Sequence, residues 1–529
     1  MTITTGEATM RLLARYGVDT VFGIPGVHTL DFCRGLGEGG AIRHVQARNE
    51  LGAGFMADGY ARSSGRPGVV LTISGPGVTN AATSLGQAFA DSVPLLLLSA
   101  DAQSGSLGKG WGVLHEVTDL NAVTRPLTAL SRCAHRPEDV PELLAQAFSL
   151  FASGRPRPVH ISVPIDVLET HVEGDWQPVA LPGPPAPDPE QIARAAGLLR
   201  SARRPVILTG GGAAGADVTA IAERLGAVVI ASNAGKGVVR DDHALSLGAA
   251  TVRPEVQDYL AGADAVLAIG TELSETDSFV PRMEFSGPII RVDLDARKMN
   301  DLYPASVSII ADAAPAIAEL MNALSKGAPA EGGAGTVAGL RGRIADGLSS
   351  SEAQHMRVLR VLREALPLEA MVMGDACQLV YSGAFQFPVS MPRRWHYAAG
   401  YCALGYAFPN AIGAKIANPD VPVVAIAGDG GAMFTIQELV TAAELKQPIP
   451  YIIWENGGLK QIQDDMRAGN VPRVGVDGIN PDFLGLARAM HCLAVEPDSA
   501  DGFANAIIEA QSVERPTLIL LHENSEWLT

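Results

Sequence analysis

Short apolar runs rich in β-branched residues recur along the chain and alternate with stretches rich in Ala, Leu and Glu. Residues 68–73, 205–208 and 422–427 are examples of these runs. Such runs are typical of strands buried on both faces, and the stretches between them suit helices. This alternation predicts parallel sheets covered by helices, with ligands at the carboxyl ends of the strands. We therefore expect an α/β protein with three doubly wound parallel-sheet domains.

Two stretches divide the chain into three blocks. The segment 177–189 contains six prolines, and the segment 325–339 is rich in Gly and Ala, so both are typical of linkers. A chain of 529 residues also exceeds the size of one hydrophobic core. We expect three domains, listed here by residue range: 1–176, 190–325 and 345–529.

Composition excludes several classes of protein. The formal net charge of −17 argues against nucleic acid as a partner, because phosphate binding needs a basic face. The apolar run 93–98 is far shorter than a membrane-spanning helix, so we interpret it as a buried strand and expect no membrane association. The first residues lack a basic stretch followed by an apolar one, which favours a cytoplasmic location. Five cysteines without a Cys-x-x-Cys pair predict reduced thiols.

Polar side chains follow two predicted strands of the third block. Asp429 follows the strand 423–427 within Gly-Asp-Gly-Gly, and Asn456 follows the strand 450–455 and precedes two glycines. With the carbonyl of Gly458, these side chains would give Mg²⁺ three of its preferred oxygen ligands. The glycines at 428, 430 and 431 would let N–H groups approach a diphosphate at the start of a helix. The alternative is a Gly-rich turn with a helix-capping Asp, which the matching second strand end disfavours.

This Gly-Asp-Gly motif, with Asn 27 residues after its Asp, resembles the fingerprint of the thiamine-diphosphate superfamily that includes acetolactate synthase, pyruvate decarboxylase and benzoylformate decarboxylase. The resemblance covers the whole chain, and its further motifs, in family order, are residues 22–26, 48–62, 74–80, 91–94 and 405–414. It implies thiamine diphosphate and Mg²⁺ as cofactors. It also implies that the domains are a pyrimidine-binding, a central and a diphosphate-binding domain.

By this resemblance, Glu50 activates the cofactor. A carboxylate at N1′ of the aminopyrimidine promotes the imino tautomer, whose 4′-nitrogen removes the C2 proton of the thiazolium. The alternative role is a helix-opening charge favoured by the helix dipole. Because family members take this glutamate and the diphosphate site from different subunits, we expect a homodimer at minimum and a homotetramer as the full assembly.

The resemblance also implies cofactor contacts elsewhere. The carbonyl of Cys402 aligns with the acceptor of the 4′-amino group, and Leu404 aligns with the apolar residue that bends the cofactor, although either side chain could be ordinary core. Gln378 is the expected side-chain contact of its segment, where Leu379 replaces a residue that is often polar. The full set of expected cofactor contacts is Gly26, Pro76, Asn80, Gln378, Cys402, Leu404, Gly428, Gly430, Gly431 and Gly458.

The reaction implied is decarboxylation of a 2-oxo acid, after which the enamine is either protonated or captured by a second oxo acid. Acetolactate synthases carry a lysine in the segment that matches residues 163–167, and a tryptophan at the position of Asp465. This chain has neither, which argues against acetolactate synthesis.

Substrate residues are expected on the segment after the metal-binding asparagine. Gln461, Asp464 and Asp465 would line an acidic pocket suited to a guanidinium group, which carboxylates bind through paired hydrogen bonds. A solvated helix face is the alternative for the two aspartates. His28 and His115 lie where relatives keep active-site residues and could protonate the enamine. Their alternative is a structural role.

Together these features resemble decarboxylases that convert 5-guanidino-2-oxopentanoate (2-ketoarginine) into 4-guanidinobutanal and CO₂. The alternatives are an acetolactate-synthase-like carboligase, a carboxyethylarginine-type synthase and a non-catalytic thiamine-diphosphate-binding protein. Retention of Glu50, Asp429 and Asn456 disfavours the last of these. The glycines at 210–212 follow a predicted strand but lack dinucleotide-binding spacing, so we do not expect FAD.

Overall fold

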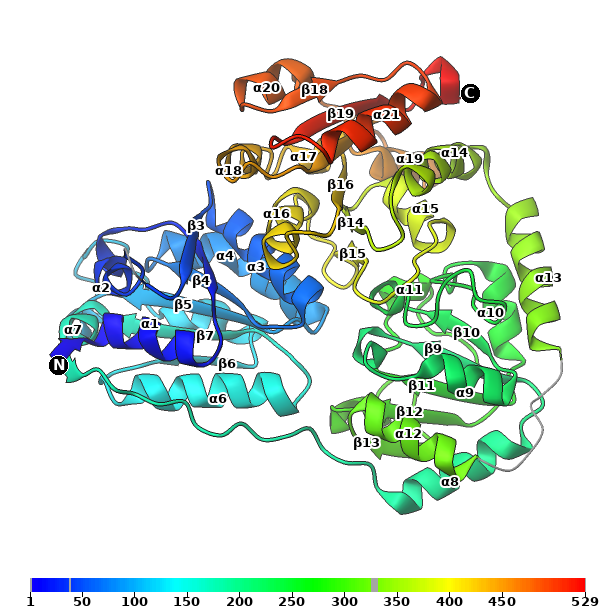
Figure 1. Ribbon diagram of the computed structural model, residues 1–529, viewed down its shortest axis with the longest axis horizontal. Coiled ribbons are helices and arrows are strands. Elements are labelled where there is room, and N and C mark those ends of the chain that lie inside the picture. Colours follow the sequence, from blue (N-terminus) through cyan, green and yellow to red (C-terminus); the bar gives the residue numbers. More distant parts are fainter. Residues whose placement is uncertain (1, 38–39, 325–331, 529) are drawn as a thin grey trace.

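The computed structural model describes residues 2–37, 40–324 and 332–528, which form three α/β domains. Figure 1 shows the N-terminal domain in blue to cyan, the central domain in green and the C-terminal domain in yellow to red. Each domain is built on a parallel sheet with helices packed against it. The predicted fold class is therefore confirmed.

The N-terminal domain has a sheet of six parallel strands in the order β3-β2-β4-β5-β7-β6. Its strands are β2 (Thr20–Gly23), β3 (Arg43–Gln46), β4 (Gly68–Thr72), β5 (Leu95–Asp101), β6 (Leu130–Cys133) and β7 (Val159–Pro164). Its helices are α1 (Thr5–Arg15), α2 (Leu30–Arg34), α3 (Glu50–Ser64), α4 (Pro76–Ala90), α5 (Leu120–Thr124), α6 (Asp139–Ser153) and α7 (Ile165–Glu169), with 3₁₀ turns η1 (Val27–Thr29), η2 (Ser104–Ser106) and η3 (Arg125–Leu127). Strands β1 (Thr2–Thr4) and β8 (His171–Glu173) form a separate antiparallel pair. Every residue of β5 is buried, as expected for a strand covered on both faces.

The C-terminal domain repeats this topology, with the strand order β15-β14-β16-β17-β19-β18. Its strands are β14 (Met371–Gly374), β15 (Trp395–Tyr397), β16 (Val423–Gly428), β17 (Pro450–Glu455), β18 (Leu493–Val495) and β19 (Thr517–His522). Its helices are α14 (Ser350–Ala365), α15 (Gln378–Gln386), α16 (Ala407–Ala417), α17 (Asp429–Ala432), α18 (Glu438–Glu444), α19 (Lys460–Ala468), α20 (Phe483–Ala489) and α21 (Ala500–Ala510), with the turn η7 (Glu526–Leu528). Numbered within each domain, both sheets have the order 2-1-3-4-6-5, and the adjacent first and third strands mark a topological switch point where ligands bind in such sheets.

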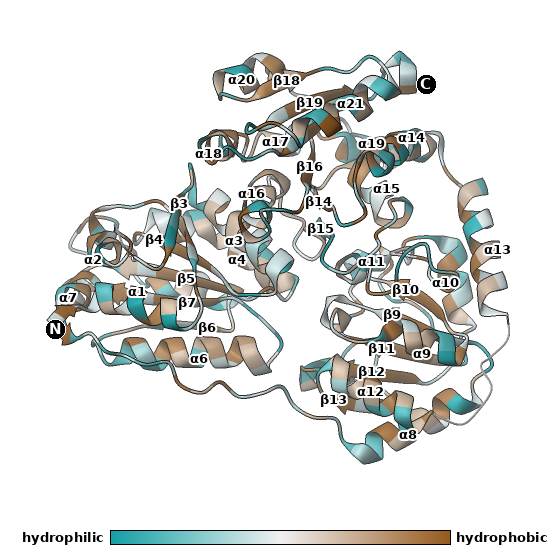
Figure 2. Ribbon diagram, viewed as in Figure 1, coloured by the Kyte–Doolittle hydropathy of each residue, from teal (hydrophilic) through white to brown (hydrophobic). Residues whose placement is uncertain are grey.

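The central domain has five parallel strands in the order β10-β9-β11-β12-β13. Its strands are β9 (Pro205–Thr209), β10 (Val228–Ala231), β11 (Ala265–Ile269), β12 (Ile289–Asp293) and β13 (Val307–Ile310). Its helices are α8 (Pro189–Ser201), α9 (Val218–Leu225), α10 (Pro254–Ala261), α11 (Glu275–Ser278) and α12 (Ala313–Ala323), with the turns η4 (Gly211–Ala213), η5 (Asn233–Gly235) and η6 (Ala296–Asn300). Figure 2 shows the strands of this sheet as predominantly hydrophobic.

The two predicted linkers differ in structure. Residues 177–188 contain neither helix nor strand and run along the outside of the protein to α8 (Figure 1). In the second linker, residues 325–331 lie outside the described residues, but α13 (Gly333–Asp346) begins within the segment that we expected to be a linker. This part is helical because Val337 and Leu340 are buried against the central domain, which stabilises the helix despite its glycines.

Helices α3 and α16 pack against each other where the N-terminal and C-terminal domains meet (Figure 1). A Cβ atom on Gly59 of α3 would overlap the carbonyl of Asn410, and one on Gly413 of α16 would overlap the carbonyl of Met56. The glycines therefore allow the two backbones to touch. Helices α3 and α16 thus form a direct contact between the N-terminal and C-terminal domains.

Within the described residues, none of the helices has the length and apolar character needed to cross a lipid bilayer. The five cysteines are free thiols, as the sequence predicts.

Candidate active site

The predicted site residues follow strands at equivalent positions of the two similar sheets. In the N-terminal domain they come after β2, β3, β4 and β5, and in the C-terminal domain after β14, β15, β16 and β17. These are the first four strands of each sheet, so their carboxyl ends lie side by side. The site is thus built on loops held by rigid strands.

Glu50 is the first residue of α3. The side chain of Asn49 caps this helix by accepting a hydrogen bond from the backbone of Leu51. Glu50 is buried, with 7% of its surface exposed, and its Oε2 accepts a 2.9 Å bond from the amide of Asn80. Asn80 lies in α4, after β4, the next strand along the chain. The structure therefore brings together two predicted residues that are 30 positions apart in the sequence.

His28 and His115 form a pair although 86 residues of sequence separate them. Their ring centroids lie 5.0 Å apart in an edge-to-face arrangement. His28 pairs through Nδ1 with the hydroxyl of Ser74 at 2.8 Å, while His115 Nδ1 is buried without a hydrogen-bond partner among the described residues. Burial, together with the neighbouring ring of His115, lowers the pKa of His28. The pair therefore favours a neutral His28 at pH 7.

Loops after β2 and β4 approach the histidines closely. A Cβ atom on Gly26 would lie 2.5 Å from Cγ2 of Ile73. Gly75 has a φ of +55°, and its Cβ would lie 2.5 Å from the carbonyl of His115. Pro76 then opens α4, where its missing N–H costs no hydrogen bond. Gly26 and Pro76 thus lie in the same loop cluster as the histidine pair.

Asp429 is completely buried at the end of β16. Its Oδ1 accepts from the backbone of Gly430 at 2.9 Å, and its Oδ2 accepts from the backbones of Gly457 and Gly458, each at 2.9 Å. The amide of Asn480 also donates to Oδ2 at 2.8 Å. The carboxylate therefore lies directly beside the loop that carries Asn456, as the sequence analysis expects.

The glycines around Asp429 keep this loop cluster tight. A Cβ on Gly428 would lie 3.0 Å from that of Cys377, and one on Gly430 would lie 2.9 Å from the side chain of Leu459. A Cβ on Gly431 would lie 3.1 Å from Oδ1 of Asp375. Gly458 has a φ of +106°, which side chains rarely adopt.

Asp375 is a functional candidate that the sequence analysis missed. It directly follows β14, is fully buried, and accepts from the backbones of Ala376 at 2.8 Å and Ala407 at 3.3 Å. Burial raises the pKa of Asp375 to about 6. An acidic residue directly after a buried strand was the available signal, because the same signal identified Asp429.

Gln378 begins α15 and contacts the predicted substrate segment. Its amide donates to Gln461 at 3.2 Å and to Asp464 at 3.1 Å, so expected cofactor and substrate residues are neighbours. Asp464 also forms ion pairs with Lys460 at 2.8 Å and Arg467 at 3.1 Å. Partial burial acts to raise the pKa of Asp464, but the bonds to Lys460 and Gln378 hold it below its ordinary value.

The two predicted acidic residues differ in their partners. Two cations of the same helix already neutralise Asp464, whereas Asp465 is exposed and accepts a 3.1 Å bond from the amide of Gln461. Glu455 pairs with His522 and with the amide of Asn480. Asp465 is therefore the most available carboxylate for a cationic substrate group.

Cys402 and Leu404 lie in the turn between β15 and α16. Cys402 has a φ of +54°, and Leu404 is partly buried. The N-terminal domain holds this turn from the end of α4. Asp91 accepts from the backbone of Gly400 at 2.8 Å, and Gln87 accepts from that of Ala403 at 3.2 Å.

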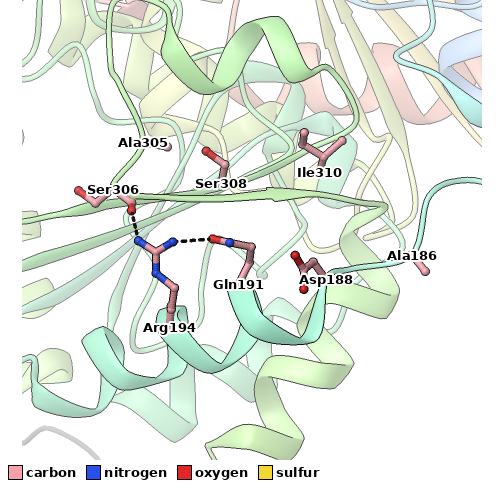
Figure 3. Close-up of a pocket in the computed structure, with 8 residues that line it drawn as sticks. All are labelled: Ala186, Asp188, Gln191, Arg194, Ala305, Ser306, Ser308 and Ile310. Carbon is pink, nitrogen blue, oxygen red and sulfur yellow. Dashed lines mark hydrogen bonds between the residues drawn. The ribbon is translucent and has the colours of Figure 1, made fainter.

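The central domain contains none of the predicted site residues. Its Gly210 packs so closely on Gly270 that a Cβ would overlap the Gly270 carbonyl, so close packing of two loops accounts for this glycine. A cavity of about 550 Å³ lies at the edge of this domain, where Arg194 donates to Gln191 and to the carbonyl of Ser306 (Figure 3). The cavity is remote from both loop clusters described above, and its lining residues are Ala186, Asp188, Gln191, Arg194, Ala305, Ser306, Ser308 and Ile310.

Comparison with known proteins gives matches across the chain. The models for thiamine pyrophosphate enzymes match as the N-terminal TPP binding domain over residues 3–123, the central domain over 192–320 and the C-terminal TPP binding domain over 375–521. A probable 2-ketoarginine decarboxylase of Pseudomonas aeruginosa is 48% identical over 94% of this chain and 90% of its own length. The acetolactate synthase large subunit of Corynebacterium glutamicum is 31% identical over 98% of this chain and 86% of its own length. The large subunit of acetolactate synthase isozyme 1 of Escherichia coli is 31% identical over 86% of this chain and 82% of its own length.

Proposed function

Because the chain belongs to the thiamine pyrophosphate enzyme family, we propose that it is a Mg²⁺-dependent decarboxylase of a 2-oxo acid, with 5-guanidino-2-oxopentanoate as its substrate. The observation that carries this proposal is the pair of polar centres at the carboxyl ends of strands: Glu50 with Asn80 in one domain, and Asp429 with its glycine loop in the other. The products are 4-guanidinobutanal and CO₂.

The donor set around Asp429 fits a metal-bound diphosphate. Its carboxylate, the amide oxygen of Asn456 and the carbonyl of Gly458 are hard oxygen donors of the kind that Mg²⁺ prefers. Gly428, Gly430 and Gly431 have no side chains, so the backbone N–H groups at this strand end could approach the diphosphate closely. These residues would hold the metal and the diphosphate of the cofactor, and Gln378 would contact the same end.

Bound thiamine diphosphate supplies a nucleophilic carbon and an electron sink for decarboxylation. Glu50 would hold a proton at N1′ of the aminopyrimidine, and the bond from Asn80 keeps one of its oxygens in place. The carbonyl of Cys402 would accept from the 4′-amino group, and Leu404 would support the ring by apolar contact. His28, neutral near pH 7 because burial lowers its pKa, and His115 would move a proton to the product carbon.

The choice of substrate is supported by the acidic helix α19 and by the 48% identical relative named as a probable 2-ketoarginine decarboxylase. Asp465 would pair with the guanidinium, while Gln461, which contacts Asp465, and Asp464, which contacts Gln378, would line the approach to the cofactor. A carboxylate without a cationic partner prefers such a group over a methyl group.

The test is release of CO₂ from a panel of 2-oxo acids by the purified protein with thiamine diphosphate and Mg²⁺. We expect the highest kcat/KM for 5-guanidino-2-oxopentanoate, ahead of pyruvate and of branched-chain and aromatic 2-oxo acids. A higher kcat/KM for pyruvate would refute the substrate assignment. No CO₂ from any member would refute the decarboxylase assignment.

Acetolactate synthase activity is the second candidate, because relatives of that name are about 30% identical over nearly the whole chain. The same assay distinguishes it, since capture of the intermediate by a second oxo acid would yield an acetohydroxy acid. We expect aldehyde as the main product, and a carboxyethylarginine-type synthase would instead require an acceptor.

The proposal includes assembly and location. A homodimer is needed if Glu50 of one subunit acts on a cofactor held by the partner, and we propose a homotetramer in the cytoplasm. Domains at residues 1–176, 190–325 and 345–529 would supply the pyrimidine, central and diphosphate parts. Light scattering of the purified protein with and without cofactor tests the assembly.

A further inference from the structure

Glu438 reaches from the C-terminal domain to the backbone immediately before Glu50. It begins α18 and is completely buried. Its Oε1 accepts from the backbone N–H groups of Arg48 and Asn49, each at 3.0 Å, and its Oε2 lies 3.1 Å from the N–H of Arg48. One carboxyl group thus engages both backbone amides that precede Glu50, across 390 residues of sequence.

The surrounding packing leaves this connection little freedom. A Cβ atom on Gly52, in the first turn of α3, would overlap the carboxyl group of Glu438. The hydroxyl of Thr441, one turn further along α18, lies 2.9 Å from Oε2 of Glu438 and 3.3 Å from the carbonyl of Gln46, so it can donate its proton to either oxygen. Since Gln46 ends β3, α18 contacts both the end of that strand and the start of the next helix.

These contacts fix the direction in which the chain enters α3. The side chain of Asn49 caps the helix from within the N-terminal domain, and Glu438 holds the two residues before it from outside. Glu50 is the next residue, so rotation of the backbone at Arg48 or Asn49 would swing its carboxylate away from Asn80. A misplacement of about 1 Å at a reacting group costs on the order of a hundredfold in rate.

We propose that Glu438 is a positioning residue that fixes Glu50 for its action on the cofactor, an inference that rests on the role of Glu50 in the proposed function. The same chain then supplies both Glu50 and its anchor, even where the cofactor is held by the partner subunit. Asp429 lies only nine residues before Glu438, so the anchor is part of the segment that starts at the expected metal site.

The first test measures backbone hydrogen exchange in the cofactor-free protein, which needs no turnover. Glu438→Ala is expected to increase exchange in the segment 46–56 about tenfold or more, because buried hydrogen bonds protect amides. Glu444→Ala is the matched control: Glu444 ends the same helix and pairs with the Arg48 guanidinium at 2.5 Å, but is largely exposed. Unchanged exchange in Glu438→Ala, or an equal increase in Glu444→Ala, would overturn the anchor.

The second test separates positioning from general stability. We expect Glu438→Ala to lower kcat roughly 10- to 100-fold with the dissociation constant of thiamine diphosphate within about threefold of wild type. Glu438→Gln retains one oxygen that can accept from the two amides, so it should recover much of the rate. It also replaces the alanine variant if that variant does not fold.

Combination with Glu50→Gln provides the decisive comparison. If Glu438 acts through Glu50, its replacement should lower kcat by less than about twofold in the Glu50→Gln background. Independent, multiplying losses would refute the positioning role even if the exchange result holds. A wild-type protein that decarboxylates no 2-oxo acid would refute the proposed function instead, while exchange would still test the anchor.

Discussion

The N-terminal and C-terminal domains share one strand order but carry different chemistry at matching positions. After the second strand of each sheet comes Glu50 in one domain and the turn with Cys402 and Leu404 in the other. After the third strand comes α4, with Asn80, in one and Asp429 in the other. The first domain thus presents a carboxylate and imidazoles, and the second presents a glycine-lined oxygen cluster.

This difference shows that the strand order fixes where functional groups lie. The residues in the loops after the strands determine the chemistry of those groups. The two domains also contact each other reciprocally. Glu438 of the C-terminal domain accepts hydrogen bonds from the residues before α3, and Asp91 of the N-terminal domain accepts one from the turn before α16. Helices α3 and α16 touch through Gly59 and Gly413. Each domain therefore helps to shape the other's loops.

The largest effect is expected at Glu50. Glu50→Gln should lower kcat about 10²- to 10⁴-fold, because it removes a proton-transfer group, while the affinity for thiamine diphosphate stays near wild type. Steady-state CO₂ release and a fluorescence titration with cofactor measure the two quantities. Glu7→Gln, which changes a first-turn glutamate of α1 in the same domain, is the control. Wild-type turnover in Glu50→Gln would show that Glu50 is not needed for catalysis. It would then contradict the assignment of cofactor activation to the N-terminal domain.

In the other domain, Asp429→Asn should act first on binding. Loss of its charge is expected to weaken Mg²⁺-dependent cofactor affinity about 10- to 100-fold, since hydrogen bonds to charged groups contribute roughly 1.5–3 kcal/mol. Calorimetric titration at fixed Mg²⁺ measures this change. Asp420→Asn, in the exposed turn before the same strand, should bind normally. Unaltered affinity in Asp429→Asn would contradict the metal site.

The shared helix contact predicts a stability effect. Gly413→Ala should lower the free energy of unfolding by about 1–3 kcal/mol, because the new methyl group overlaps the carbonyl of Met56. Gly197→Ala in α8 is the control: its Cβ meets nothing within 4 Å, so it should be neutral or stabilising by up to about 1 kcal/mol. Urea unfolding distinguishes the variants, and equal stabilities would argue against close contact of α3 and α16.

Selectivity should depend on Asp465. Asp465→Trp is expected to lower kcat/KM for 5-guanidino-2-oxopentanoate about tenfold relative to pyruvate, because an ion-paired hydrogen bond is lost. Asp465→Asn retains the shape without the charge and should show part of this loss. Competition assays with both oxo acids measure the ratio. An equal effect on the two substrates would mean that the acidic helix face has no role in specificity.

A pH dependence of stability is expected at the domain contact. Burial raises the pKa of Glu438 from 4.5 to about 7. A raised folded-state pKa means that the native protein binds more protons, so this contribution is full below pH 4.5 and is lost as pH rises through about 7. The slope is at most about 1.4 kcal/mol per pH unit. Urea unfolding from pH 5 to 8 should show this slope in wild type and not in Glu438→Gln.

The sequence alone determined the fold class and most candidate residues. Buried parallel strands read as continuous apolar runs, so β4, β5, β9 and β16 were visible without any long-range information. Glu50, Asp429 and Asn456 lie in short motifs that can be recognised in the sequence without a structure. The helical part of the second linker escaped prediction, because packing rather than composition stabilises α13.

Tertiary structure decided which remote groups meet, both within a domain and between domains. Glu438 and Asn480 were missed because their partners lie far away in sequence or are backbone amides, which no residue pattern displays. Asp375 carried a signal, since it directly follows a buried strand, but its contact with the backbone of Ala407 is set only by the fold. Likewise the pairing of His28 with His115 follows from how loops from two strands meet. Hydrogen bonds require distances near 3 Å, and only the folded chain sets such distances between remote segments.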